Sequence, residues 1–233
     1  MSTPSQTGSE SPIVLTNISK LFGRFAVLRD ISARFQPGHL YAIFGDNGAG
    51  KSTLLRVIAG LARASAGTVK IFGQSRSATA KSRLGYMAHA PLLYDEMTGM
   101  ENLRYFAGLY GISNTARCEQ AMRTVGLDPA LARRAGEYSQ GMRQRLSLAR
   151  ATLHDPEIVL LDEPFSNLDP HSAEAMGKVL GRMRDEGKTI LVVTHQAGHV
   201  ADVADESIWM STGHLAEWEP GIGASRYATG ARP

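Results

Sequence analysis

Residues 45–53, GDNGAGKST, constrain the fold of this chain more than any other segment. They follow an apolar run, residues 40–44, that is typical of a buried strand, and they precede a helix predicted from Leu54 to Gly60. The spacing Gly-x4-Gly-Lys-Ser between a strand and a helix is the pattern of a phosphate-binding loop, or P-loop. Glycines let backbone N–H groups turn inward around a phosphate, and a helix N-terminus favours negative charge. The segment therefore predicts an α/β fold that binds a nucleotide.

The side chains of the P-loop have separate expected roles. The Lys51 amine is expected to reach the β- and γ-phosphates, and the Ser52 hydroxyl is expected to hold Mg²⁺. Pattern, preceding strand and following helix occur together, which a chance glycine-rich turn would not combine. The predicted nucleotide-binding residues of the loop are Gly45, Asp46, Asn47, Gly48, Ala49, Gly50, Lys51, Ser52 and Thr53.

A second apolar run, residues 158–161, ends in Asp162-Glu163-Pro164. Alone this pattern is common, but beside a P-loop it points to a second part of the same site. In α/β proteins, ligands bind at the carboxyl ends of the strands. Neighbouring strand residues point in opposite directions, so the two carboxylates can take different roles. We expect Asp162 to bind Mg²⁺, directly or through water, and Glu163 to polarise the attacking water.

Shorter patterns outline the rest of the chain. Thr98 followed three residues later by Glu101 is a capping box, which predicts a helix that begins there. Other helices are predicted over residues 114–125, 139–150 and 172–186, and strands over residues 13–15, 26–28, 31–35, 68–72, 84–88, 158–161 and 189–194. Residues 207–210 and 214–218 flank a short turn and predict a hairpin. Together the patterns indicate an α/β core that is interrupted by a helical insertion.

Composition narrows the class of protein. Hydrophobic residues make up 43% and charged residues 20%, as in an ordinary globular domain. Cys118 is the only cysteine, which excludes an intrachain disulfide and a multi-cysteine metal site and suits a reducing compartment. No apolar stretch approaches the roughly 20 residues that cross a bilayer, and residues 1–12 contain no basic, apolar leader. Any work at a membrane would therefore require a partner.

The segment YSQGMRQR, residues 138–145, lies between the P-loop and the acidic pair in the sequence. It resembles the Leu-Ser-Gly-Gly-Gln signature of the ATP-binding cassette (ABC) ATPases, which is followed by a basic, apolar helix. Ser139 and Gly141 are retained, whereas Tyr138, Gln140 and Met142 depart from the pattern. The resemblance implies that Ser139 and Gly141 contact the γ-phosphate of a nucleotide held by the opposite subunit.

Other elements of the family follow in the expected order. Residues 166–169, SNLD, resemble the D-loop, and Thr194-His195 resembles the switch histidine at the end of a strand. Phe22 stands where the family has an aromatic residue that stacks on adenine; a core aromatic is the alternative. The resemblance covers residues 12–218. It implies a P-loop NTPase fold with an ABC-type ATPase core, an antiparallel β subdomain and a helical insertion, and it implies ATP and Mg²⁺ as cofactors and Glu163 and His195 as catalytic residues.

The domain boundaries follow from the same comparison. We expect an ABC ATPase domain over residues 12–218, with a helical subdomain at about residues 90–155. Residues 1–11 and 219–233 are polar or rich in Gly, Ala, Arg and Pro, and they are expected to be flexible tails.

One position departs from the family in an informative way. Where family members usually carry a Gln that offers an oxygen to Mg²⁺ and meets the membrane partner, this chain has His89. A neutral imidazole offers one ring nitrogen and a protonated one offers none. Either the partner contact tolerates His and Mg²⁺ takes a water ligand, or His89 is a trait of a subfamily and a candidate metal ligand.

Family ATPases work as head-to-tail dimers on transmembrane permease subunits. The resemblance therefore implies a homodimer or heterodimer of ATPase subunits, with residues 89–97 toward the permease. It also implies a cytoplasmic location, peripheral on the inner face of the cell membrane.

The cargo is open. Three local features resemble the haem-exporter ATPase of cytochrome c maturation: His89 with Ala90-Pro91, residues 162–165, and residues 194–196. The Tyr-Ser-x-Gly-Met form of the signature also occurs in other bacterial export ATPases. The expected function is thus an ATPase that powers export, with haem as one cargo and another substrate as the alternative.

Functions of other classes fit the sequence to different degrees. A non-transport ABC ATPase, such as an iron–sulfur assembly factor, stays open. A nucleic-acid ABC ATPase is disfavoured because no long heptad run is present and the formal charge is only +3. A translation factor of this family is disfavoured because it would carry two cassettes, whereas this chain has one P-loop pattern. A small GTPase is disfavoured because no Asn-Lys-x-Asp motif is present. No nucleic-acid partner is expected.

Overall fold

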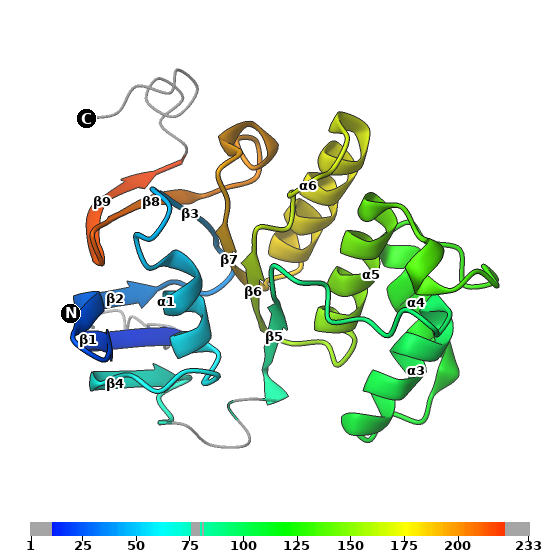
Figure 1. Cartoon of the computed structure of the whole chain (residues 1–233), viewed down its shortest axis with the longest axis horizontal. Helices are drawn as coiled ribbons and strands as arrows, with labels where there is room; N and C mark the ends of the chain where they lie inside the picture. Colours follow the sequence, from blue (N-terminus) through cyan, green and yellow to red (C-terminus); the bar gives the residue numbers. More distant parts are fainter. Residues whose placement is uncertain (1–10, 76–79, 81, 222–233) are drawn as a thin grey trace, which may run out of the picture.

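The computed structural model of this chain describes residues 11–75, 80 and 82–221 (Figure 1). Two sheets form within this range. The smaller is antiparallel with the order β2-β1-β4, where β1 is Ile13–Phe22, β2 is Phe25–Phe35 and β4 is Ala66–Ile71. The larger has the order β5-β6-β7-β3-β8-β9, and it is parallel except for β9, which pairs antiparallel with β8. Its strands are Leu84–Met87 (β5), Ile158–Asp162 (β6), Thr189–Val193 (β7), Leu40–Gly45 (β3), Glu206–Ser211 (β8) and His214–Pro220 (β9).

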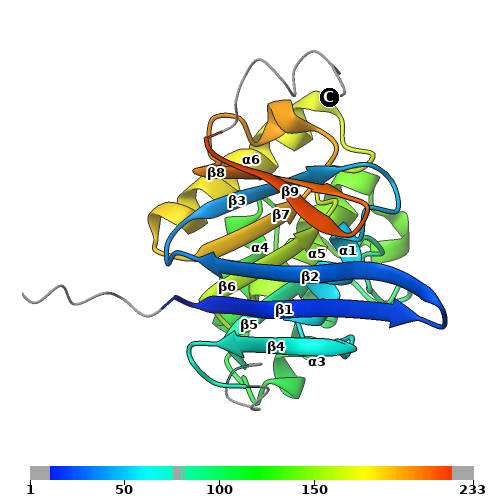
Figure 2. The ribbon, with the colours of Figure 1, turned by 90° about the vertical axis from the view of Figure 1, so that its left-hand side faces the viewer.

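Helices cover the two faces of the larger sheet. Figures 1 and 2 show α1, Lys51–Ile58, between the larger sheet and the antiparallel sheet. The helices α3, α4 and α5 lie together on the opposite side, beside α6 (Figure 1). Their bounds are Gly99–Leu109, Thr115–Thr124, Gln140–Thr152 and Pro170–Asp185, and two 3-10 turns cover Ala135–Glu137 and Ala197–His199. The helical insertion therefore consists of three helices outside the sheet.

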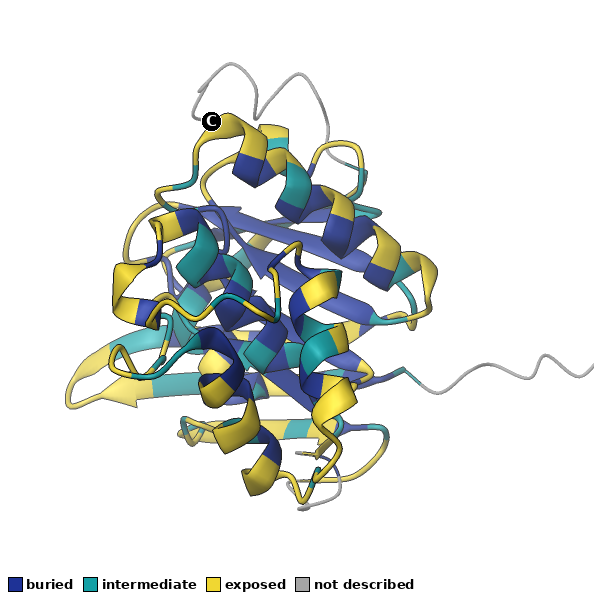
Figure 3. Cartoon of the chain, turned by 90° about the vertical axis from the view of Figure 1, so that its right-hand side faces the viewer, coloured by how far each residue is buried: buried dark blue, intermediate teal, exposed yellow. Residues whose placement is uncertain are grey.

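Alternation along the buried strands explains why the fold has two cores. On β3, Leu40, Ala42 and Phe44 pack with the outer helices, whereas Tyr41 and Ile43 pack with α1 and the antiparallel sheet. The strands β6 and β7 divide in the same way. Because successive side chains of a strand point to opposite faces, a continuous apolar run can serve both layers at once. Figure 3 shows the resulting pattern, with buried strands behind helices that are exposed only on their outer faces.

Hydrogen bonds at the N-caps define where several helices begin. The predicted capping box is confirmed: the Glu101 N–H donates to Thr98 Oγ1 at 3.2 Å, and the Thr98 N–H donates to Glu101 Oε2 at 2.8 Å. For α6 the predicted start at residue 172 is two residues late, because Asp169 Oδ1 accepts from the Ser172 N–H at 2.9 Å and Pro170 occupies the first turn. Proline fits there because the first N–H groups of a helix have no partner within the helix.

Several other boundaries differ from the prediction. The strand predicted over residues 13–15 continues to Phe22 as β1. The helix α1 begins at Lys51 rather than Leu54 and ends at Ile58, because the last P-loop residues already have helical geometry, with Gly50 as N-cap. The runs 26–28 and 31–35 are parts of one strand, β2. The strand β9 continues to Pro220, and Glu219 pairs with Ser207. The second tail therefore cannot begin at 219; residues 222–233, like residues 1–10 of the first tail, lie outside the described residues.

Close packing of α5 on β5 gives a stability prediction. A Cβ added at Gly85 would lie 2.4 Å from the Ala151 carbonyl oxygen, so the helix would have to shift. Gly85→Ala is expected to lower the free energy of unfolding by about 1–3 kcal/mol, the usual cost of overpacking. Urea denaturation measures it. The matched control is Gly108→Ala on α3, where an added Cβ meets nothing within 4 Å and where Ala favours the helix. Equal stability of the two variants would contradict the prediction.

Candidate nucleotide-binding site

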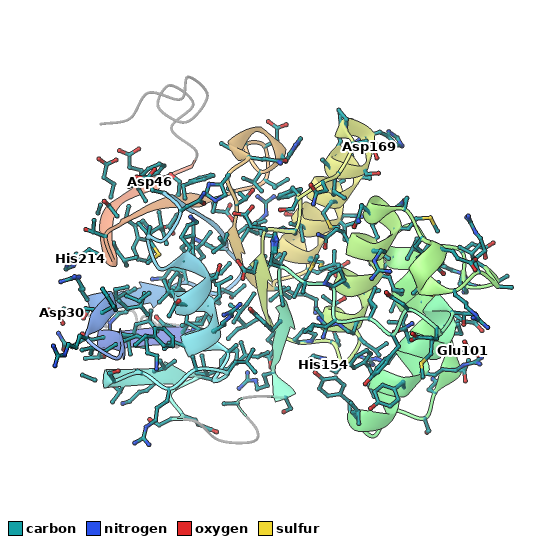
Figure 4. The ribbon with its side chains drawn as sticks, in the orientation of Figure 1. Asp30, Asp46, Glu101, His154, Asp169 and His214 are labelled. Carbon is teal, nitrogen blue, oxygen red and sulfur yellow. The ribbon has the colours of Figure 1, made fainter. Side chains whose placement is uncertain are left out.

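The P-loop connects β3 to α1 and is held by close backbone contacts on both sides. Gly45 has φ 142° and a Cβ there would lie 2.1 Å from the Met210 carbonyl oxygen of β8. Gly50 has φ 100° and would place a Cβ 2.7 Å from the carbonyl oxygen of Val27 on β2. Both sheets therefore contact the loop so tightly that only glycine fits at these two positions. Figure 4 shows Asp46 at the start of this loop, beside the end of β3.

Lys51 lies folded against its own loop. The side chain is only 6% exposed, and Nζ donates to the carbonyl oxygens of Gly45 at 2.7 Å and Asp46 at 3.0 Å. Burial lowers the pKa of Lys51, and the nearby carboxylates of Glu163, Asp162 and Asp46 oppose this shift. A buried amine with only carbonyl partners is suited to exchange them for phosphate oxygens, which carry full charge.

The acidic strand end lies against the P-loop. The Ser52 Oγ donates to Asp162 Oδ1 at 2.8 Å, and Asp162 is 1% exposed. The second carboxylate oxygen of Asp162, Oδ2, is buried and has no hydrogen-bond partner among the described residues. A hydroxyl and a carboxylate oxygen are ligands that Mg²⁺ accepts, together with phosphates and water. The donor set present here therefore fits a divalent ion bound with a nucleotide.

Glu163 occupies a strained position next to Asp162. Its φ is 54°, a left-handed conformation that non-glycine residues rarely adopt, and its N–H donates to the Val193 carbonyl oxygen at 2.9 Å. Its Oε1 lies 3.2 Å from His195 Nε2, and the side chain is 14% exposed. Burial raises the pKa of Glu163, while His195 and Lys51 act in the opposite direction. A raised pKa makes the carboxylate a better proton acceptor, and strained backbone of this kind is common at functional sites.

Three strand ends bring the other residues to the same edge of the sheet. Met87 of β5 pairs with Leu161 of β6, and Asp162 pairs with Val193 of β7. His89 and His195 each follow their strand by two residues, so they flank Glu163. Together with the P-loop these residues surround a cavity of about 460 Å³. Its lining consists of Val27, Asn47, Gly48, Ala49, Gly50, Lys51, Ser52, Thr53, His89, Glu163, Ser166, His195 and Gln196.

Four predicted nucleotide-binding or metal-binding residues contact the cavity indirectly or lie away from it. Gly45, Asp46 and Asp162 lie behind the lining, where they hold Lys51 and Ser52. Phe22 is not in the lining; it is 54% exposed at the end of the β1–β2 hairpin, with the Lys20 amine 4.5 Å from its ring centre. Phe22 is thus not among the residues that border this cavity, and its role at the adenine stays a prediction.

The two signature residues also lie outside this cavity. Ser139 is the N-cap of α5, and its Oγ accepts from the Met142 N–H at 3.2 Å. Gly141 is buried in the first turn, where an added Cβ would lie 3.0 Å from Ser172 Oγ of α6. Both residues therefore lie at the start of α5 in the helical insertion, and their contact with another subunit's nucleotide stays a prediction.

Sequence reasoning missed three residues of the lining. Gln196 directly follows His195, and Ser166 begins the segment that resembles the D-loop, so both had a positional signal. Val27 of β2 had none, because only the packing of the antiparallel sheet against the P-loop brings it to the cavity.

Comparison with known proteins shows the family. A family model described as ABC transporter matches residues 28–166. The chain is 36% identical to the ABC transporter ATP-binding protein NatA of Bacillus subtilis (strain 168), and the match covers 87% of each chain. The chain belongs to the ABC transporter family. It is also 35% identical to the Nod factor export ATP-binding protein I of Burkholderia orbicola (strain AU 1054), over 91% of this chain and 72% of that protein.

Solved ABC cassettes share the fold. A dimeric cassette, MJ0796 bound to ADP and Pi, matches with a TM-score of 0.81 at 23% identity, over 89% of this chain and 98% of that chain. The predicted ABC-type α/β fold is confirmed. This ABC protein is an ATP-binding subunit and an ATP hydrolase. Within the described ranges, none of its helices combines the length and the apolar character that a membrane span requires.

Proposed function

We propose that this ABC ATPase binds Mg²⁺ and ATP at the P-loop cavity and powers export through separate permease subunits. The observation that carries the proposal is the meeting of Lys51, Ser52, Asp162, Glu163 and His195 at one sheet edge. Isothermal titration with a non-hydrolysable ATP analogue, followed by phosphate release with ATP, tests binding and turnover separately. A chain that neither binds the analogue nor releases phosphate would contradict the proposal.

Each residue of the site would have a separate role in phosphoryl transfer. Lys51 would move from its two carbonyl partners to the phosphates, and the P-loop N–H groups would bind the same oxygens. Ser52 and Asp162 would hold Mg²⁺, which neutralises charge on the phosphates when bound. Glu163 would accept a proton from the attacking water. His195, 3.2 Å from Glu163, would orient that carboxylate and contact the γ-phosphate.

We infer that Ser139 and Gly141 complete the site of a second copy of this chain. The inference is tested by mixing two inactive variants, Lys51→Met and Ser139→Phe. A head-to-tail mixed dimer contains one site with both defects and one site with neither. Mixing is therefore expected to restore ATPase activity that each variant lacks alone. Phosphate release measures it, and no recovery would indicate that this chain pairs with a different cassette.

We propose that the permease contacts an exposed aromatic patch. The patch consists of the exposed residues Leu92, Tyr94, Tyr105, Leu109 and Tyr110 and the half-buried Phe106, which also packs against the core. The Tyr94 and Tyr105 rings are 5.0 Å apart, and the Tyr105 and Phe106 rings are 5.5 Å apart. Asn102 holds the backbone of Tyr94 in place with two hydrogen bonds. Its Oδ1 accepts from the Tyr94 N–H at 2.8 Å, and its Nδ2 donates to the Tyr94 carbonyl oxygen at 2.9 Å. Exposed apolar clusters of this kind mark protein interfaces.

Two substitutions by aspartate on this patch test whether it contacts the permease. The double variant Tyr105→Asp/Leu109→Asp is expected to lose copurification with the permease and to keep ATP binding, because neither residue lines the cavity. Leu61→Asp is the control, since Leu61 is also exposed but lies after α1, outside the patch. Retained copurification of the double variant would exclude the patch as the contact.

Export is the direction that the relatives favour, since one of them is named as an export ATPase. The proposed location is accordingly cytoplasmic, peripheral on the inner face of the cell membrane. Haem export for cytochrome c biogenesis is the second candidate, and it rests on His89 with Ala90-Pro91, residues 162–165 and residues 194–196. Mass spectrometry of the copurified membrane protein decides the cargo. Copurification with soluble scaffold proteins instead would favour an iron–sulfur assembly role.

A further inference from the structure

His89 lies at the nucleotide cavity rather than away from it. The pairing of Met87 with Leu161 places the residues that follow β5 beside those that follow β6, and neighbouring strands are about 4.8 Å apart. His89 accordingly lines the same cavity as Ser52, Lys51 and Glu163. Within the described ranges its imidazole has no hydrogen-bond or ion-pair partner, whereas the other histidine of the cavity, His195, is 3.2 Å from Glu163.

The protein supplies few other ligands for an ion. Ser52 Oγ and the unpartnered Asp162 Oδ2 are the side-chain oxygens that it offers beside the P-loop. The described ranges contain no group of three or more His, Cys, Asp or Glu side chains that could hold an ion by themselves. The remaining ligands must come from the nucleotide and water. One additional side-chain ligand would therefore change which divalent ion the site prefers.

We propose that the His89 imidazole binds the divalent ion that accompanies the nucleotide, and that it shifts the preference of the site from Mg²⁺ toward Mn²⁺. The inference rests on the proposed ATP site and concerns its metal selectivity. Mg²⁺ takes oxygen ligands almost exclusively, whereas imidazole nitrogen is a good ligand for later divalent ions, and affinity rises from Mn²⁺ to Co²⁺ and Ni²⁺. Replacing His89 by Gln restores an oxygen ligand and removes the nitrogen.

Pulsed electron paramagnetic resonance of the full chain with Mn²⁺ and a non-hydrolysable ATP analogue tests the ligand directly. A ¹⁴N coupling to Mn²⁺ is expected in the unmodified chain, and it should be absent in His89→Gln. The coupling should persist in His195→Gln, which removes the other imidazole of the cavity. Persistence in His89→Gln, or loss in His195→Gln, would assign the nitrogen to another residue and overturn the inference.

Calorimetric titration of the metal–analogue complexes gives a second measurement. His89→Gln is expected to weaken binding with Mn²⁺ about tenfold and binding with Mg²⁺ less than about threefold, which correspond to about 1.4 and 0.6 kcal/mol. His199→Gln is the matched control: His199 contacts Phe165 outside the cavity lining, so both affinities should stay at their original values.

The possible results separate this inference from the proposed function. Tight analogue binding without a ¹⁴N coupling, or an equal loss for both metals, overturns the role of His89 and leaves the ATP site intact. Failure of the unmodified chain to bind the analogue with any divalent ion overturns both.

Discussion

Glu163→Gln is expected to bind ATP with an affinity close to that of the unmodified chain and to hydrolyse it at least about 100-fold more slowly. The amide has nearly the same shape as the carboxylate but cannot accept a proton from water. The contact to His195 at 3.2 Å would persist, so the geometry of the site changes little. Phosphate release measures hydrolysis, and calorimetry with ATP measures binding.

The same variant also tests dimer formation. Because ATP would persist in the site, Glu163→Gln should elute from a sizing column as a dimer with ATP and as a monomer with ADP, if two copies close on the nucleotide. Glu186→Gln is the control, since Glu186 is exposed at the end of α6, away from the cavity. Turnover of Glu163→Gln within threefold of the unmodified chain would remove Glu163 from the proposed role.

Lys51→Met is expected to weaken ATP binding by about 100-fold, or about 2.7 kcal/mol, because a charge-assisted contact to the phosphates is lost. Methionine has a similar volume and carries no charge, and the pKa of Lys51 is lowered by burial, so the replacement removes a charge that is costly to bury. The fold should therefore persist, which circular dichroism checks.

The control for this second variant is Lys178→Met on α6. Lys178 pairs with Glu174 at 2.6 Å on the exposed surface, and its loss should leave ATP binding within twofold. Equal affinity of Lys51→Met and the unmodified chain for ATP would show that the lysine stays with its loop carbonyls and never reaches the phosphates.

Elements held by local chemistry were predictable. The capping box at Thr98 and Glu101 is made within four residues, so its sequence pattern was sufficient. The apolar runs of β3, β6 and β7 were recognised because each must be buried on both faces. The start of α1 was misplaced because glycines within the P-loop masked the first helical turn, which begins at Lys51. Glycine has low helix propensity but is tolerated at an N-cap.

Long-range packing produced the features that sequence reasoning missed. Val27 borders the cavity only because β2 contacts the P-loop at Gly50. Glu163 has a left-handed backbone, and its N–H donates to the Val193 carbonyl oxygen of the next strand, a contact that no local pattern indicates. The aromatic patch on α3 and the preceding loop combines residues whose common exposure no periodicity indicates.

The sequence by itself determined the chemistry of this ABC ATPase: a P-loop, an acidic strand end and a strand-end histidine. These motifs are short and local, so each can be identified from its own residues. Only the tertiary structure decided that Lys51 bonds its own loop, that Ser52 donates to Asp162, and that His89 reaches the cavity whereas Phe22 does not. Such contacts join residues that are far apart in the chain, and their distances depend on how strands, helices and loops pack together.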